Sequence, residues 1–263
     1  MYDFTYTKPT SIPDALKALG ADPEAKPLAG GQTYIPVLKQ RLAKPTALVD
    51  LSALGLSGIT ETDGKIRIGA MTTHHMIESN EAIQRHIPGL AKMASWIGDT
   101  QVRHRGTMGG SLANNDPSAC YPSAVLACGA TIVTDKRSIE ADDFFQGMFT
   151  TALEPGELIT AIEFPFMEKS NYEKFRNPAS RYAMVGVFVA KGPHGTRVAI
   201  SGAGQSGVFR HAEMEQALTK TWSADAVRDI KTPADNLNGD IHASPEYRAH
   251  LIGVMARRAV EAA

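Results

Sequence analysis

The sequence predicts an α+β fold, with two lobes in residues 1–166 and a small C-terminal domain of antiparallel sheet and helices. Strand-like and helix-like segments alternate through the first part, and two glycine pairs each join a strand-like segment to a helix-like one. After a linker-like stretch over 167–172, short alternating segments indicate a separate antiparallel sheet. We expect lobes over about 1–52 and 53–166, and a C-terminal domain over 172–263.

The first lobe is expected to hold two helices and short strands. Ser11-Ile12-Pro13-Asp14 combines a capping hydroxyl, an early proline and an acidic first turn, and Gly20 ends this helix. Apolar residues at helical spacing predict a second helix over 34–42. Strands are expected over 26–28 and 47–51, so the first glycine pair opens the second helix.

The remaining elements follow from hydrophobic spacing and turn residues. In the second lobe we expect strands over 65–70, 130–133 and 157–165, helices from Thr72–Thr73 and over 86–96 and 117–127, and an irregular loop over 98–106. In the C-terminal domain we expect strands over 172–176, 184–190 and 196–201, then helices over 210–219, 224–230 and 245–262.

Composition and charge limit the classes of function. The 263 residues carry a formal net charge of −1, so no global basic field favours nucleic acid or a membrane surface. No apolar run reaches the roughly 18 residues of a membrane-spanning helix, and residues 1–6 do not resemble a signal peptide. The expected location is the cytoplasm.

The two cysteines, Cys120 and Cys128, are too few for a zinc or iron–sulfur site and are expected to be buried thiols. Any metal-based redox centre is therefore expected in another chain. No Ser–His–Asp or paired-carboxylate arrangement marks a catalytic residue in this chain.

The two glycine pairs carry the functional signal. Ala29-Gly30-Gly31-Gln32-Thr33 and Thr107-Met108-Gly109-Gly110-Ser111 place backbone without a Cβ beside small polar side chains. Such backbone turns sharply, points N–H groups at one place and allows a phosphate to come close. Together they predict one phosphate-bearing ligand between two lobes. Each loop alone is also compatible with an ordinary tight turn, and Asp116 with a helix cap.

Other motifs are weaker. Residues 202–207 fit Gly-x-Gly-x-x-Gly literally, but they do not open a βαβ unit and are expected to form a flexible turn. His74 and His75 point about 100° apart on a helix, which favours one packed and one exposed histidine over a metal site. Arg103 and Arg105 are compatible with phosphate binding or with partner carboxylates in the fold.

Beyond these patterns, the two loops resemble the motifs of a known family. They are similar to Ala-Gly-Gly-(Gln/His)-(Ser/Thr) and Thr-Ile-Gly-Gly-Asn of the FAD-binding medium subunits of the molybdenum hydroxylases, the xanthine dehydrogenase and aerobic carbon monoxide dehydrogenase group. The resemblance covers nearly the whole chain. Further matching stretches are Leu48-Val49-Asp50-Leu51, Ile68-Gly69-Ala70-Met71-Thr72-Thr73-His74, Gln101-Val102-Arg103 and Glu154-Pro155-Gly156-Glu157-Leu158-Ile159.

The resemblance implies a FAD-binding domain of the vanillyl-alcohol-oxidase (PCMH) type over 1–166, with FAD between its lobes and its pyrophosphate on both glycine loops. It implies an apolar contact of Ile97 with the flavin, with Leu158, Ile159 and Tyr182 beside the ring system. The expected FAD-binding residues are Ala29, Gly30, Gly31, Gln32, Thr33, Tyr34, Ile97, Thr107, Gly109, Gly110, Ser111, Ala113, Asp116, Leu158, Ile159 and Tyr182.

Two positions depart from the family pattern. Ser111 replaces the usual asparagine, and Cys120 stands where many members carry an aspartate that binds the cofactor. Either Asp116 takes over that hydrogen bonding, or the contact is lost and FAD is held more weakly; we expect the first.

The resemblance implies an electron-transfer subunit with two partners. A large subunit would carry molybdopterin cytosine dinucleotide, and a small subunit would carry two [2Fe-2S] clusters. Electrons would pass through FAD to an external acceptor, in a dimer of heterotrimers. The alternatives are a stand-alone flavin oxidase or dehydrogenase of the same fold, and a scaffold that has lost its cofactor.

Overall fold

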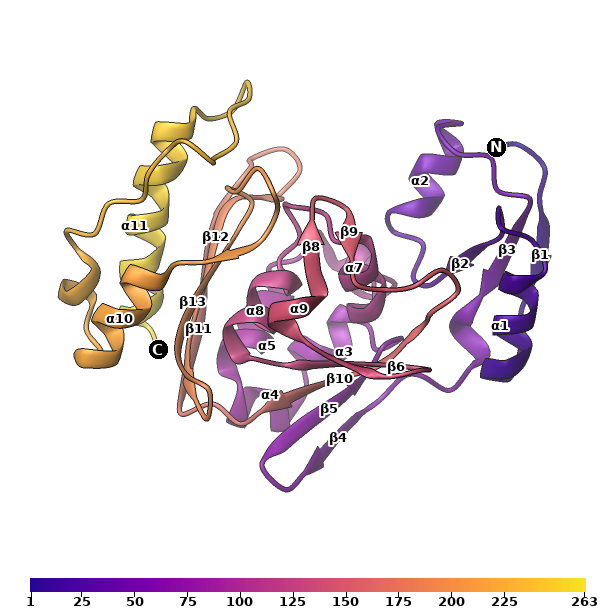
Figure 1. Ribbon diagram of the computed structural model, residues 1–263, viewed down its shortest axis with the longest axis horizontal. Helices are drawn as coiled ribbons and strands as arrows, with labels where there is room; N and C mark the ends of the chain where they lie inside the picture. The colour runs from indigo at the N-terminus through magenta and orange to yellow at the C-terminus, as the bar shows by residue number, and fades with distance from the viewer.

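The computed structural model describes residues 1–263, and its N-terminal lobe is a small parallel sheet flanked by two helices (Figure 1). The sheet has the order β1-β3-β2. Ser11 caps α1 as predicted, because its side chain accepts a hydrogen bond from the Asp14 N–H. The elements are β1 (Thr5–Thr7), α1 (Ile12–Gly20), β2 (Lys26–Leu28), α2 (Tyr34–Lys39), β3 (Ala47–Asp50) and the 3-10 turn η1 (Leu51–Ala53).

The central lobe is built on a five-stranded antiparallel sheet with the order β4-β5-β10-β6-β7. Ile162 of the central strand pairs with Ile68 on one side and Ile132 on the other, and all three are fully buried. The strands are β4 (Ile59–Thr62), β5 (Lys65–Gly69), β6 (Thr131–Thr134), β7 (Ser138–Glu140) and β10 (Ile159–Pro165), with the hairpin β8 (Phe145–Gly147) and β9 (Thr150–Thr151) beside them.

Helices of the central lobe pack on one another and on this sheet, and three of them differ from the predictions. The helix expected over 86–96 is present over Pro88–Ser95. A separate helix that was not predicted, Glu81–His86, comes before it, and Ile87, with φ −144°, separates the two. A short helix forms within the expected loop over 98–106, and the helix expected from Pro117 begins at Tyr121. The helices are α3 (His74–Glu78), α4 (Glu81–His86), α5 (Pro88–Ser95), α6 (Thr100–Arg103), α7 (Met108–Asn114), α8 (Tyr121–Cys128) and α9 (Ala141–Phe144).

The C-terminal part is an antiparallel sheet, β11-β12-β13-β14, which lies between helices of the central lobe and its own helices (Figure 1). Alternate residues of β12 point to opposite faces: Phe188 joins the core of the central lobe, and Val187 and Val189 join a core with α10 and α11. The elements are β11 (Lys169–Arg176), β12 (Ala183–Gly192), β13 (Gly195–Ser201), β14 (Phe209–Arg210), α10 (Ala212–Lys220), η2 (Ala224–Val227) and α11 (Pro245–Glu261).

Two expectations for this part are corrected. The linker expected over 167–172 is mostly strand, because β11 starts at Lys169, and the helix expected over 224–230 is only the 3-10 turn η2. Residues 202–207, which match Gly-x-Gly-x-x-Gly literally, form a turn between β13 and β14, and a turn was expected there. Hydrogen bonds attach this turn to neighbouring segments. The Gly202 N–H donates to the Pro117 carbonyl at 2.7 Å, and Arg248 donates to the Gly202 carbonyl at 3.1 Å.

Three further findings complete the fold. None of its helices combines the length and apolarity needed to cross a membrane. No group of three or more His, Cys, Asp or Glu side chains is placed to hold a metal ion. Cys120 and Cys128 are free and buried, which confirms the prediction of two buried thiols.

Candidate functional site

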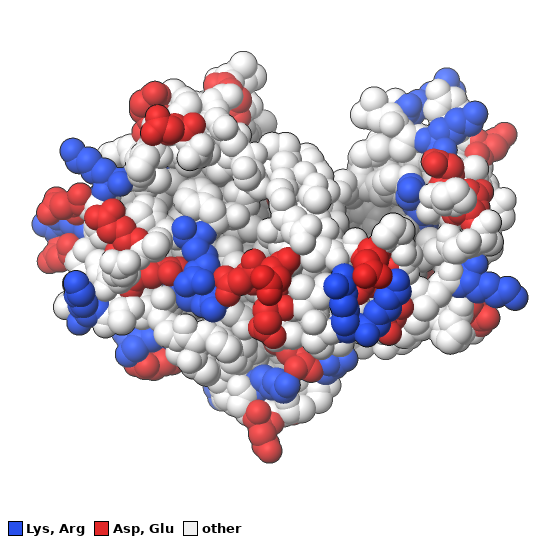
Figure 2. Space-filling view, in the orientation of Figure 1, with Lys and Arg blue, Asp and Glu red and all other residues white.

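A cavity of about 580 Å³ opens where the N-terminal lobe, the central lobe and the C-terminal sheet meet. Figure 2 shows the notch between the N-terminal lobe and the rest of the molecule, with charges of both signs scattered around it. All sixteen residues expected from the sequence line this one cavity: Ala29, Gly30, Gly31, Gln32, Thr33, Tyr34, Ile97, Thr107, Gly109, Gly110, Ser111, Ala113, Asp116, Leu158, Ile159 and Tyr182.

The two glycine loops touch each other at one side of the cavity. A Cβ on Gly30 would lie 2.0 Å from the backbone oxygen of Arg105, beside the second loop. A Cβ on Gly110 would lie 3.2 Å from the Cβ of Ala29 and 2.8 Å from Thr107 Oγ1. Glycine is therefore required because two backbone segments approach closely.

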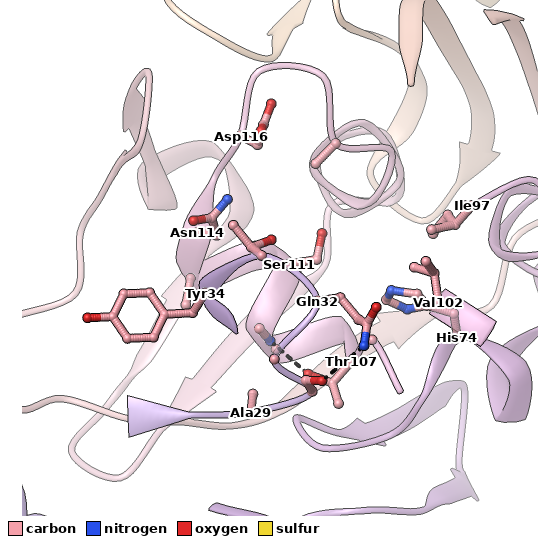
Figure 3. A pocket seen from close by; sticks show the side chains of 18 of the residues that line it. Ala29, Gln32, Tyr34, His74, Ile97, Val102, Thr107, Ser111, Asn114 and Asp116 are labelled. Carbon is pink, nitrogen blue, oxygen red and sulfur yellow. Dashed lines mark hydrogen bonds between the residues drawn. The ribbon is translucent and has the colours of Figure 1, made fainter. Parts of the chain in front are cut away.

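The backbone N–H groups of the two loops have different partners. In the second loop, Thr107 Oγ1 caps α7 by accepting from the Gly110 N–H at 3.2 Å, and the Gly109 N–H donates to the Ala70 carbonyl at 2.8 Å (Figure 3). In the first loop, none of the N–H groups of residues 30–33 donates to another group of the chain. The first loop thus offers unused donors to an anion, and the second contributes close approach and side chains.

Asp116 forms a local turn at the cavity wall. Its Oδ1 accepts from the Ser118 N–H at 2.8 Å, but α8 begins further on, so Asp116 does not cap that helix. The carboxylate lines the cavity in the same region as Asn114 and Ser111 (Figure 3). Its role as the acidic contact of the cofactor stays a prediction.

His74 was expected to be the packed member of a histidine pair, and it also lines the cavity. Burial, aided by the nearby charge of Arg103, lowers the pKa of His74 to about 4, so its ring is neutral at pH 7. Its Nδ1 lies 3.1 Å from the hydroxyl of Tyr121. His75 is more exposed, stacks on His104 at 4.1 Å between ring centroids, and lies 2.8 Å from Glu78. One packed and one exposed histidine agree with the prediction.

A second group of residues lines the cavity around Ile97, which Figure 3 places across the view from Tyr34. Lys174, on β11, donates from Nζ to the Trp96 carbonyl at 2.9 Å and lies 3.5 Å from Cys120 Sγ. The sequence reasoning marked Cys120 only as a departure and did not find Lys174. The one available signal was alternation along β11, which puts Lys174 on the same face as the buried Tyr172.

Tyr182 is the exposed aromatic residue of this group, with 51% of its surface accessible. Partial burial raises its pKa, and the proximity of Asp116 and Cys120 acts in the same direction. The phenol is therefore protonated at neutral pH and is available as a hydrogen-bond donor at the cavity mouth.

Glu157 fixes the chain just before Leu158 and Ile159. Its side chain is fully buried, and its oxygens accept from Arg137 at 3.0 Å, from the Thr134 hydroxyl at 2.7 Å and from the Glu154 N–H at 2.8 Å. Hydrogen bonding to Arg137 is the main cause that lowers the pKa of Glu157 to about 2. This network holds the apolar edge of the cavity in place.

Comparison with known proteins identifies the family. The family model described as the FAD binding domain in molybdopterin dehydrogenase matches residues 2–167. The glyceraldehyde dehydrogenase medium chain of Sulfolobus acidocaldarius is 34% identical, covering 98% of this chain and 97% of its own length. The carbon monoxide dehydrogenase medium chain of Afipia carboxidovorans is 35% identical, covering 99% and 96%.

Solved structures agree. A carbon monoxide dehydrogenase from Hydrogenophaga pseudoflava, which lacks the Mo-pyranopterin moiety of its molybdenum cofactor, matches with a TM-score of 0.87 at 31% identity, covering 100% of this chain and 97% of that chain. Fold and cavity thus define a FAD-binding oxidoreductase subunit. The chain belongs to the FAD-binding medium subunits of the molybdenum hydroxylases, as the resemblance of its motifs implied.

The cavity fits FAD in its chemistry. Unused N–H groups in the first loop suit a pyrophosphate, and the glycines allow the two loops to approach each other closely. Ile97, Leu158 and Ile159 supply apolar wall, and the cavity volume falls in the usual range for cofactor sites. The FAD cofactor predicted for this chain is therefore confirmed, and the contacts of individual residues with it stay predictions.

Proposed function

We propose that this chain is the electron-transfer subunit of a three-component molybdenum hydroxylase. A large partner would hold molybdopterin cytosine dinucleotide and oxidise the substrate, and a small partner would hold two [2Fe-2S] clusters. The observation that carries the proposal is the single cavity that unites both glycine loops in a chain whose relatives are named medium chains. A metal site within the chain is not required.

Different residues of the cavity would contact different parts of FAD. Residues 30–33 bind the pyrophosphate through backbone N–H groups, and Thr107, Ser111 and Asp116 bind ribityl or phosphate oxygens. Ile97, Leu158 and Ile159 exclude water from the ring system, and Tyr182 covers its open side. FAD, when bound, supplies the chemistry that accepts electrons one or two at a time. The protein residues orient and shield it, and no general base in this chain takes part.

The assembly and surroundings follow the same reasoning. We propose a dimer of heterotrimers in the cytoplasm, with an external acceptor that receives the electrons. Relatives are named for glyceraldehyde and for carbon monoxide, so the substrate is set by the large partner.

Purification of the native complex tests the proposal. FAD, iron, sulfide and molybdenum should co-purify with this chain and two partners, and the complex should transfer electrons to an added dye. A native preparation with FAD alone, whose flavin is reduced directly by an organic substrate, would support the alternative of a stand-alone flavin oxidase or dehydrogenase. A native preparation without flavin would support a scaffold that has lost its cofactor.

A further inference from the structure

Lys174 is a buried lysine in the wall of the FAD cavity. Only 7% of its surface is accessible, and no other lysine is buried to this degree. None of the ion pairs in the structure includes it. The adjacent carboxylate, Glu173, pairs instead with Lys92 at 2.6 Å.

The hydrogen bonding of the Lys174 ammonium is incomplete. An ammonium has three N–H donors, and the structure gives it two acceptors: the Trp96 carbonyl at 2.9 Å and the thiol sulfur of Cys120 at 3.5 Å. Sulfur is a weak acceptor. A buried cation without a counter-charge is costly unless its donors are satisfied. Because Lys174 lines the cavity, the missing acceptor belongs to the molecule that fills it.

The position of Lys174 indicates which part of FAD it meets. The Trp96 carbonyl that it contacts precedes Ile97, and Cys120, its other contact, lines the same cavity as Tyr182. Ile97 and Tyr182 are the residues proposed to lie against the flavin ring. The unused N–H donors for phosphate lie on the first glycine loop instead.

We propose that the Lys174 ammonium binds an electron-rich atom of the flavin ring, a carbonyl oxygen or ring nitrogen, and thereby raises the affinity of the bound FAD for electrons. The inference rests on the proposed function of the same cavity. Reduction adds negative charge to the ring, and a neighbouring positive charge favours the more negative form. The absence of a carboxylate at position 120 leaves that charge uncompensated.

The test uses the full chain with bound FAD and two readouts that do not depend on the activity of the complex. The midpoint potential is measured by redox titration against a reference dye, and the dissociation constant for sulfite is measured from bleaching of the flavin absorbance. Sulfite adds negative charge to the ring in the same way as reduction. In Lys174→Met we expect a more negative potential and a sulfite affinity lower by about tenfold. Lys174→Arg should move both values less.

Lys92→Met is the matched control, because Lys92 contacts the same strand, β11, but does not line the cavity. It should leave both values unchanged. A Lys174→Met chain that keeps FAD with wild-type potential and wild-type sulfite affinity overturns the inference and leaves the proposed function standing. A wild-type chain without FAD defeats the proposed function itself.

If Lys174→Met releases FAD, the affinity of apo wild-type and variant chains for ADP distinguishes a contact with the flavin ring from a contact with the phosphates. ADP carries both phosphates but no flavin ring. Unchanged ADP affinity in the variant supports a ring contact, and an equal loss for ADP and FAD shows a phosphate contact and overturns the inference. Lys174→Gln repeats the comparison if the Met variant does not fold.

Discussion

The two ends of the FAD cavity are built in different ways. The end at the glycine loops is backbone: two chain segments in contact, unused N–H groups and little room for side chains. The end near Ile97 is made of side chains from distant segments, with Cys120 from the start of α8 and Lys174 from β11. In the function that we propose, the first end recognises phosphate by geometry, and the second sets the electrical environment of the ring.

This contrast has a consequence for how each end responds to change. At the first end, two backbone segments are already in contact and have no room to move apart without changing the loops. One added methyl group should therefore disrupt the geometry of this end. Side chains at the second end can be exchanged with little movement of the chain, and the effect is on charge. Substitutions at the two ends should therefore differ in the kind of effect they have: loss of the binding geometry at the first end, and a change of charge at the second.

The largest effect is expected for Gly30→Ala. The new Cβ would lie 2.0 Å from the Arg105 backbone oxygen and 2.7 Å from its carbonyl carbon, so one of the two loops must move. We expect FAD affinity to fall by about 100-fold or more, measured by flavin fluorescence during titration. Gly20→Ala is the control, since a Cβ there has no atom within 4 Å. Full FAD binding by Gly30→Ala would refute the backbone description of this end.

A smaller effect, on stability, is expected for Glu157→Gln. The change breaks the contact with Arg137 and leaves a buried polar group poorly satisfied, which should lower the free energy of unfolding by about 2–3 kcal/mol. Urea unfolding at neutral pH measures this. Glu154→Gln is the control, because the side chain of Glu154 is 57% exposed and its ion pairs should contribute about 0.5 kcal/mol or less.

The lowered pKa of Glu157 also predicts that the stability of the folded chain depends on pH. The pKa of Glu157 is lowered from 4.5 to about 2 in the folded chain, so its ionised form is favoured by folding. Its contribution is complete above pH 4.5 and is lost as the pH falls through about 2. The stability gap between wild type and Glu157→Gln should therefore narrow from pH 5 towards pH 2. A gap that stays constant over this range would contradict the assignment.

Most residues at the glycine-loop end of the cavity could be predicted from the sequence alone. A glycine pair beside hydroxyl side chains has few structural explanations, so residues such as Gly30 and Gly110 were found from local pattern alone. The order of strands and helices also followed from hydrophobic spacing. Errors arose at two short helices, Glu81–His86 and Thr100–Arg103, and where the start of a polar strand, residues 169–172, looked like a linker.

The other end could not be read in this way. Lys174 becomes informative only when the fold buries it beside Cys120, some 54 positions away in the chain. A lysine in a strand pattern is usually exposed, so alternation with Tyr172 along the strand was too weak a signal to mark this one as buried. Similarly, the difference in N–H use between the two glycine loops depends on Ala70, which comes from another segment.

Asp116→Ala tests a residue between the two ends and should have an intermediate effect. Loss of the carboxylate should weaken FAD binding by about tenfold. Asp116→Asn keeps an oxygen that accepts from the Ser118 N–H, so it separates loss of the turn from loss of the charge. Asp22→Ala is the control, because Asp22 accepts from the Glu24 N–H at 2.8 Å in an equivalent turn outside the cavity. Unchanged FAD occupancy and affinity in Asp116→Ala would show that Asp116 only forms the turn.

The smallest effect is expected for Cys120→Asp. A carboxylate at this position lies within reach of the Lys174 ammonium and would supply its missing counter-charge. The flavin potential should shift in the negative direction, by less than in Lys174→Met, because the ammonium remains in place. Sulfite affinity should fall by about threefold, and neutral Cys120→Ser should match the wild type. If Cys120→Asp instead raised the potential, Lys174 would not be the charge that the ring senses, and the electrical role assigned to this end of the cavity would have to pass to another residue.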